Sequence, residues 1–240
     1  MNSILEFQNV KKIIEGKPIL KNISFVVPKR KIVAFLGPNG AGKTTTLKIA
    51  AGLLEHESGQ IIINENEKSL YKSTNPVMFI PDYPLLYEEL TGFEYVEMMI
   101  DMFQIKKKNP YESLYRYDMD DELHKKVKDL SLGNKKKIAL FTTLLSNPSL
   151  LLLDEFISGI DPINMKIIKA ILLDYVNNGN AILLSTHQLE VAQHFCDTLI
   201  LINNGEILED NLSITLVTEN HSTLEDYFIS TLKTVVSKLL

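Results

Sequence analysis

The sequence has little of several features that would each narrow its class. Cys196 is the only cysteine among the 240 residues, which excludes an internal disulfide and any metal site built from clustered cysteines. A membrane-spanning helix needs about 20 consecutive apolar residues. The longest apolar runs here, such as Leu150 to Leu153 and Ala181 to Leu184, have only the length of strands. We therefore expect a chain that does not cross a bilayer.

The chain also lacks an excess of basic residues over acidic ones, with 25 Lys and Arg against 30 Asp and Glu. The formal net charge is -5, whereas nucleic-acid binding normally demands a basic face, so we expect no nucleic-acid partner. Two lysine runs, Lys106 to Lys108 and Lys135 to Lys137, are local exceptions, and we expect both to be solvated surface. The segment Met1 to Phe7 lacks the basic region and long apolar stretch of a signal peptide, which predicts a cytosolic protein.

The remaining composition is that of an ordinary globular protein, with 45% hydrophobic residues and no low-complexity tract. The length permits one large domain or two small ones. Because the chain has no internal repeat and no Gly/Ser-rich linker, we expect one domain over 1–240. Its core is expected at about 1–82 and 147–210, with an inserted helical subdomain at about 83–146 and a C-terminal tail at 211–240.

Short apolar segments predict strands along most of the chain. They are Ile4 to Val10, Ile23 to Val27, Lys31 to Leu36, Gln60 to Asn64, Pro76 to Ile80, Leu150 to Leu153, Ala181 to Leu184 and Thr198 to Ile202. The first two are separated by a turn at Glu15 to Pro18, and a helix is expected from Lys43 to Leu54. The last three alternate with helix-length stretches, which is typical of a parallel sheet covered on both faces.

A mostly helical region is expected from about Tyr83 to Gly133. Residues at helical spacing form one apolar stripe, and a stripe of this kind is usually part of a core. The stripe consists of Phe93, Val96, Ile100 and Phe103. The alternative is an adaptable docking groove for a partner helix, since three methionines lie beside the stripe. These are Met98, Met99 and Met102.

A glycine-rich segment between a predicted strand and a predicted helix matches the pattern GxxxxGK[ST] of phosphate-binding loops. It reads Gly37-Pro38-Asn39-Gly40-Ala41-Gly42-Lys43-Thr44 and is followed by Thr45. Glycines let the backbone approach phosphate oxygens, and consecutive N–H groups at the helix N-terminus supply positive potential. Lys43 would reach the outer phosphates and Thr44 would ligate magnesium.

Polar side chains follow two of the predicted buried strands. Asp154 and Glu155 come directly after Leu150 to Leu153, and His187 follows Ala181 to Leu184 by three residues. Strand ends of this kind lie at the edge of the sheet where a nucleotide binds. Asp154 suits magnesium binding, and Glu155 is placed to polarise an attacking water as a general base. His187 would contact the γ-phosphate and that water.

With these elements in order, the chain resembles the ABC transporter ATPases from about Leu5 to Asp210. The discriminating segment is Leu130-Ser131-Leu132-Gly133-Asn134, which is similar to the family's Leu-Ser-Gly-Gly-Gln signature. Ser131 is also a good N-cap for a helix that we expect to run to about Leu145. The resemblance implies an α/β fold: a P-loop NTPase core with a mostly parallel sheet, an N-terminal antiparallel β portion and an inserted helical subdomain.

The resemblance also implies partners. In the family the signature helix addresses the nucleotide held by the opposite subunit, so Ser131 and Gly133 would bind ATP across a homodimer or a heterodimer. Ser158 to Pro162 is similar to the family's D-loop, where Asp161 supports the facing subunit. A separate multi-span membrane subunit is implied as well, which places the chain peripherally on the cytoplasmic face of a membrane.

Several positions depart from the family's pattern. Asp82 stands where the Q-loop has glutamine; its carboxylate can still bind magnesium or its water, although the flanking prolines predict a turn in either case. Leu132 replaces a signature glycine. Ile14 stands where the family stacks adenine on an aromatic ring, which predicts weaker or less base-selective nucleotide binding. Phe156 and Ile157 follow Glu155, where the family has proline and a small hydroxyl residue.

The sequence thus predicts the ATP-binding and ATP-hydrolysing subunit of an ABC transporter, which uses ATP and Mg2+ and drives transport by closure of a dimer. The segment Leu86 to Gly92 looks most like that of bacterial export-type members. One alternative is a soluble ABC ATPase acting on nucleic acid or ribosomes, which the acidic balance and the single P-loop disfavour. Another is a low-turnover nucleotide-binding switch, which the retention of Glu155 and His187 disfavours.

Overall fold

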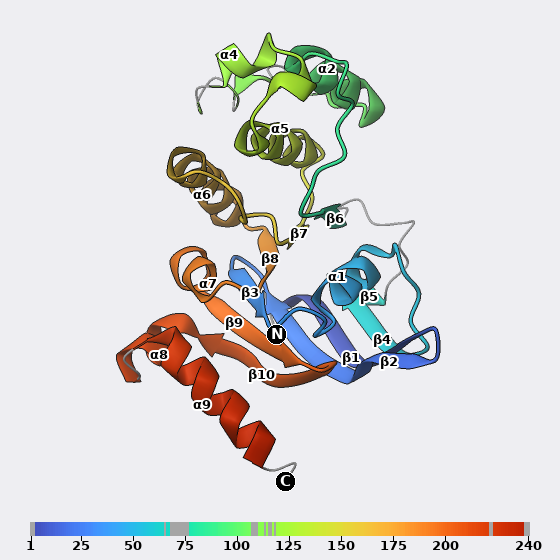
Figure 1. Ribbon diagram of the computed structural model, residues 1–240. Coiled ribbons are helices and arrows are strands. Elements are labelled where there is room, and N and C mark those ends of the chain that lie inside the picture. The colour runs from blue at the N-terminus through green and yellow to red at the C-terminus, as the bar shows by residue number, and fades with distance from the viewer. Residues whose placement is uncertain are drawn as a thin grey trace.

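The computed structural model of the chain describes residues 3–64, 66–67, 77–106, 110–112, 114, 117, 119–220 and 223–237. In this part of the chain there are two sheets, with helices around the second sheet and a helical layer beyond it (Figure 1). The first sheet is antiparallel and the second is mostly parallel. The predicted α/β fold class is therefore confirmed.

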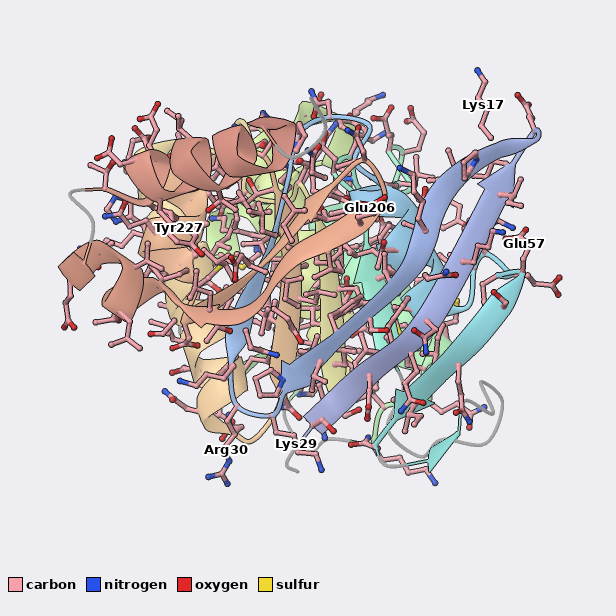
Figure 2. The ribbon with its side chains drawn as sticks, turned by 90° about the horizontal axis from the view of Figure 1, so that it is seen from below. Lys17, Lys29, Arg30, Glu57, Glu206 and Tyr227 are labelled. Carbon is pink, nitrogen blue, oxygen red and sulfur yellow. The ribbon has the colours of Figure 1, made fainter. Side chains whose placement is uncertain are left out.

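The antiparallel sheet has the strand order β2-β1-β4-β5. Its strands are β1 (Ser3–Ile14), β2 (Lys17–Pro28), β4 (Ser58–Ile63) and β5 (Asn66–Glu67). The hairpin of β1 and β2 is longer than predicted, because the turn is only Glu15-Gly16 and Pro18 lies within β2. A proline is tolerated there because β2 is an edge strand. Figure 2 shows the tip of this hairpin at Lys17 and places Glu57 near the same end of the sheet.

The second sheet has the strand order β10-β9-β3-β8-β7-β6. Its strands are β3 (Ile32–Leu36), β6 (Val77–Ile80), β7 (Leu150–Asp154), β8 (Ala181–Thr186), β9 (Thr198–Asn203) and β10 (Glu206–Ser213). All of them run parallel except β10, which pairs antiparallel with β9. Because parallel strands end at one edge, the loops after β3, β6, β7 and β8 lie together. The tail expected from residue 211 begins inside β10.

Helices surround the parallel sheet. They are α1 (Lys43–Ala51), α6 (Pro162–Asn177), α7 (Leu189–Phe195), α8 (Ile214–Asn220) and α9 (Leu224–Ser237). A separate layer contains α2 (Gly92–Met102), α4 (Asp120–Leu123), a 3-10 turn (Val127–Asp129) and α5 (Leu132–Leu145), at the top of Figure 1. No helix in the described part of the chain is both long enough and apolar enough to cross a bilayer.

The expected helical region starts later than predicted. The segment from Tyr83 to Leu90 is not helical, and α2 begins at Gly92. Thr91 fixes this start with a capping box, since its hydroxyl accepts a hydrogen bond from the Glu94 amide at 3.2 Å and its own amide donates to the Glu94 carboxylate at 2.8 Å. The prolines in the preceding loop also disfavour helix there.

The apolar stripe of α2 is mainly core. Val96 is fully buried, and Ile100 and Phe103 are partly buried against the same hydrophobic cluster. Phe93 is exposed, so the prediction is wrong for this residue. Met99 also belongs to this cluster, whereas Met102 is exposed. The methionines therefore do not form a continuous exposed groove along α2.

Candidate nucleotide-binding site

The glycine-rich loop joins β3 to α1, and its backbone geometry requires glycine at more than one position. A Cβ atom on Gly37 would lie 2.2 Å from the carbonyl oxygen of Ile202, so only glycine fits there. Gly40 has a φ angle of 80°, which favours glycine, and nothing lies within 4 Å of its Cβ position. The N-cap of α1 is Gly42, which offers no side chain to the first-turn amides. These amides are therefore available to an anion.

Lys43 lies at the centre of this loop. Although it is the first residue of α1, it is only 6% exposed. Its Nζ donates to the carbonyl oxygens of Gly37 at 2.7 Å and Pro38 at 3.2 Å, so the loop curls around the ammonium group. The next residue, Thr44, is exposed and Thr45 is half-buried. The loop thus presents one buried cation and an exposed hydroxyl at the same helix end.

The acids predicted at the end of β7 lie at this edge of the sheet. Asp154 is 6% exposed, and its Oδ1 accepts a hydrogen bond from the Ser185 hydroxyl on β8. Glu155 has a φ angle of 47°, and its amide donates to the carbonyl and hydroxyl oxygens of Ser185, both at 3.1 Å. Ser185 therefore fixes the backbone that carries both carboxylates, a role that the sequence analysis did not assign.

The Glu155 side chain contacts both Lys43 at the end of the loop and His187 after β8. Its Oε1 lies 3.4 Å from Nζ of Lys43, and its Oε2 lies 3.0 Å from Nδ1 of His187. The Glu155 side chain is 17% exposed and that of His187 is 44% exposed. Three residues predicted from separate segments therefore meet in one cluster, which is open to solvent on the His187 side.

Ser131 and Gly133 lie at the start of α5. Ser131 is its N-cap, with the hydroxyl accepting from the Asn134 amide at 3.3 Å, so the predicted cap is confirmed. A Cβ on Gly133 would lie 2.7 Å from Nδ2 of Asn164, which shows how closely α5 packs on α6. Asp161 is in turn the N-cap of α6. Within this chain these residues contact α5 and α6 rather than the glycine-rich loop.

Asp82 follows β6 and points to α5. Its Oδ1 lies 3.3 Å from Nζ of Lys136, whose side chain is fully buried.

The expectation that Lys135 to Lys137 is solvated surface is therefore wrong for Lys136 and Lys137, which are both buried. Each lysine of the run pairs with a carboxylate outside α5: Lys135 with Glu88, Lys136 with Asp82 and Lys137 with Glu122. Of the other run, Lys106 is exposed, and the rest lies outside the described residues.

The donor set fits a nucleotide with magnesium better than a metal bound by protein alone. Among the described residues, no group of three or more His, Cys, Asp and Glu side chains could hold a metal ion. Mg2+ bound with a nucleotide takes only one or two protein carboxylates together with phosphate oxygens. The exposed Thr44 hydroxyl and the Asp154 carboxylate are oxygen donors of this kind.

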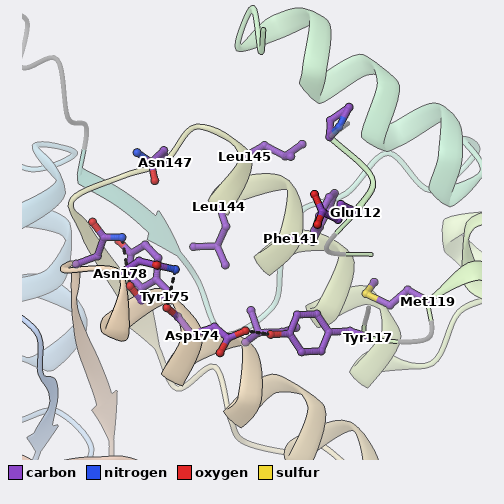
Figure 3. Close-up of a pocket in the computed structure, with 13 residues that line it drawn as sticks. Glu112, Tyr117, Met119, Phe141, Leu144, Leu145, Asn147, Asp174, Tyr175 and Asn178 are labelled. Carbon is purple, nitrogen blue, oxygen red and sulfur yellow. Dashed lines mark hydrogen bonds between the residues drawn. The ribbon is translucent and has the colours of Figure 1, made fainter. Parts of the chain in front are cut away.

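A separate pocket of about 340 Å³ lies between α5 and α6 (Figure 3). The hydroxyl of Tyr117 donates to Asp174 across it at 2.5 Å. Asn147 and Asn180, which precede β7 and β8, also line it. The pocket is thus at the edge of the sheet opposite to Lys43, and it is not part of the cluster described above.

Comparisons with known proteins agree with this geometry. The model of the family described as ABC transporter matches residues 20–158. The lantibiotic transport ATP-binding protein SrtF of Streptococcus pyogenes is 32% identical over 205 residues, which cover 85% of this chain and 89% of that protein. The fluoroquinolones export ATP-binding protein MT2762 of Mycobacterium tuberculosis is 31% identical over 203 residues, covering 80% of this chain and 65% of that protein.

Solved structures give the same result. An ATP-binding subunit of an ABC transporter superposes with a TM-score of 0.82 at 26% identity, covering 95% of this chain and 99% of that chain. A nucleotide-free ATP-binding cassette from an ABC transporter has the same fold, with a TM-score of 0.77 at 21% identity, covering 94% and 98% of the two chains. The chain therefore belongs to the ABC transporter family, as one of its ATP-binding and ATP-hydrolysing subunits.

Proposed function

We propose that the chain is a magnesium-dependent motor subunit that powers export through a separate membrane subunit. The observation that carries this proposal is the cluster in which the Glu155 carboxylate lies between Lys43 and His187. A carboxylate, an imidazole and a buried ammonium at the mouth of a phosphate-binding loop are the groups that hydrolysis of a γ-phosphate needs.

ATP enters this site with its phosphates against the loop from Gly37 to Thr45, where the uncapped amides of the first turn of α1 can donate to them. The outer phosphates compete with Glu155 for Lys43, since both are anions facing one ammonium group. Once released from Lys43, the Glu155 carboxylate can accept a proton from the attacking water. His187, which faces the same carboxylate, orients that water and donates to the γ-phosphate.

Magnesium would be held by Thr44 and Asp154, and it would neutralise part of the negative charge of the phosphates. Asp82 is a third candidate donor. Its Oδ1 faces Lys136, so only its other carboxylate oxygen would serve the ion or its water. The Asp154 carboxylate is oriented for this role by the Ser185 hydroxyl.

A second ATPase subunit completes the site. The start of α5 carries Ser131 and Gly133, and its first-turn amides and hydroxyl would face the ATP bound by the opposite subunit. The second subunit is either an identical copy or a related chain. Closure would move the helical subdomain, which we place at about 83–146, and hydrolysis would let the pair reopen.

The membrane subunit would dock beside Asp82. Three large apolar side chains that follow it are exposed, namely Tyr83 at 54%, Leu85 at 88% and Tyr87 at 65%. Clustered exposed apolar residues mark protein interaction sites. Docking there would hold the chain on the cytoplasmic face of the membrane. The name of one relative above, for fluoroquinolone export, supports the direction of transport, and the name of the other supports a transport role.

The test has two parts. Purified chain should hydrolyse ATP only with Mg2+, and Glu155→Gln should lower kcat by about 100-fold or more, the usual contribution of a general base. Affinity capture of the tagged chain from membranes should recover a multi-span membrane protein. If the rate does not respond to Mg2+ or to Glu155→Gln, the motor function is wrong. If only soluble partners are captured, the transport function is wrong.

A further inference from the structure

Lys136 is a fully buried lysine at the junction of three segments. It lies in the second turn of α5, and its side chain has 0% exposure. Its Nζ donates to the carbonyl oxygen of Ser158 at 2.9 Å and lies 3.3 Å from Oδ1 of Asp82. The ammonium also sits over the ring of Phe156, 5.5 Å from the ring centre. A buried lysine is costly unless it is paired, and here each contact comes from a loop at the nucleotide edge of the sheet.

The carbonyl that Lys136 holds belongs to the turn that starts at Glu155. The Ser158 amide donates to the Glu155 carbonyl oxygen at 3.0 Å, which closes this turn. The Ser158 hydroxyl accepts from the side-chain amide of Gln188, the residue after His187, at 3.3 Å. Glu155 itself has the strained φ angle of 47°, a conformation that neighbouring contacts must maintain. Lys136 therefore fixes the far end of a turn whose near end carries the proposed general base.

Two departures from the family pattern meet at this one ammonium group. Asp82 supplies a carboxylate where the family has a neutral glutamine, and Phe156 supplies a ring where the family has proline. Asp82 lies 3.3 Å from the buried ammonium group, and its charge offsets the cost of burying that group. Both departures thus stabilise the charged lysine, Asp82 by its negative charge and Phe156 by the face of its ring.

We propose that Lys136 is a positioning residue for ATP hydrolysis, which ties the turn bearing Glu155 to α5, the helix that Ser131 caps. Asp82 is its counter-ion. A displacement of α5 on dimer closure would then be passed to the Glu155 turn through the Ser158 carbonyl. This inference rests on the proposed function, because it assigns Lys136 to the same reaction. It predicts that loss of the lysine slows hydrolysis without weakening ATP binding.

The variant Lys136→Gln is compared with Lys136→Arg and Lys169→Gln in the full-length protein. Lys169 is a matched control because it also donates to a carbonyl, that of His194, and lies 5.5 Å from the centre of a phenylalanine ring, that of Phe195. We expect Lys136→Gln to lower kcat by about 10- to 100-fold, the cost of a small misplacement. The dissociation constant for ATP should stay within about twofold, and Lys136→Arg should recover kcat to within about threefold of wild type.

Hydrogen exchange gives a readout that does not depend on turnover. In Lys136→Gln, the amides of 155–160 should exchange faster than in wild type, while those of β8 keep their rates and Lys169→Gln changes neither region. Unchanged exchange in 155–160 would overturn the inference, as would an equal loss of kcat in Lys169→Gln. If the wild-type protein hydrolyses no ATP, the proposed function fails, and the exchange comparison still decides whether Lys136 holds the turn.

Discussion

Nζ of Lys43 lies 3.4 Å from Oε1 of Glu155, so the cation of the phosphate-binding loop faces the proposed general base directly. Both side chains are largely buried, with exposures of 6% and 17%. Screening by water is weak for such a pair, and the two charges therefore interact strongly. The phosphates of ATP must compete with this carboxylate for Lys43.

Neutralising Glu155 should therefore tighten ATP binding as well as stop hydrolysis. We expect Glu155→Gln to lower the dissociation constant for ATP by about three- to tenfold, equivalent to about 0.6–1.4 kcal/mol. The measurement is equilibrium titration with ATP in the absence of Mg2+, where no turnover occurs. Glu219→Gln, on the exposed surface of α8, serves as the control. If the affinity of Glu155→Gln for ATP is unchanged or weaker, the phosphates of ATP do not compete with the Glu155 carboxylate for Lys43.

Asp154→Asn should raise the magnesium requirement with little effect on the fold. The asparagine oxygen can still accept the hydrogen bond from Ser185, but the negative charge is lost. We expect the Mg2+ concentration for half-maximal ATPase activity to rise by about 10- to 100-fold, as for other residues that orient or bind a metal. Asp101→Asn, an exposed change on α2, should leave that concentration unaltered. An unaltered Mg2+ requirement in Asp154→Asn would remove this residue from the magnesium site.

Much of the site could be predicted because each of its parts is encoded locally. The Gly37 to Thr44 pattern, the acids after Leu153 and the Ser131 cap each follow from residues that are close in sequence. The order of parallel strands then brings their ends to one edge without further information. That is why Lys43, Glu155 and His187 could be expected to lie near one another.

The burial of Lys136 and Lys137 could not be predicted from residues close to them in sequence. A run of lysines gives no information on its own about burial, because the carboxylates that compensate for it come from distant segments. Asp82 is 54 residues from Lys136 in the sequence, and Ser158 is 22 residues away. The unusual Phe156 also gains a physical role only once the ammonium of Lys136 is seen above its ring.

The long β-hairpin should contribute to stability in a pH-dependent way through Glu57. Its carboxylate lies 2.9 Å from Nζ of Lys12 and accepts from the Ile13 amide at 2.7 Å, near the hairpin end visible in Figure 2. The hydrogen bond from Lys12 is the main cause that lowers the pKa of Glu57 below its ordinary value of 4.5. The folded state therefore binds this proton less readily than the unfolded chain does.

The sign follows from that difference in pKa. The contribution of Glu57 to stability is fully present above about pH 4.5 and is lost as the pH falls through the lowered pKa. We expect Glu57→Gln to lower the thermal midpoint at pH 7 and to make its decline between about pH 5 and pH 3 shallower than in wild type. Thermal unfolding at a series of pH values measures this, with Glu219→Gln as control. Parallel pH curves for Glu57→Gln and wild type would contradict it.

Gly133 lies so close to Asn164 that its role in packing α5 on α6 can be tested separately from its proposed contact with ATP. A methyl group on Gly133 would lie 2.7 Å from Nδ2 of Asn164, which itself donates to Asp161 at 2.6 Å. We expect Gly133→Ala to cost about 1–3 kcal/mol by overpacking. At about 2–4 °C for each kcal/mol in a chain of this size, the midpoint should fall by several degrees.

Gly133→Ala should destabilise the protein less when the side chain of Asn164 has already been shortened. An Asn164→Ala background removes the two shortest contacts, to Nδ2 at 2.7 Å and Cγ at 3.0 Å, and leaves only the contact to Cβ at 3.1 Å. The double-mutant cycle should therefore give a coupling of more than about 1 kcal/mol. ATPase activity should recover with stability, because the methyl group points at α6 and leaves the first-turn amides of α5 open. If stability recovers and activity does not, the surface of Gly133 itself must contact the nucleotide of the opposite subunit, and its role is more than packing within one chain.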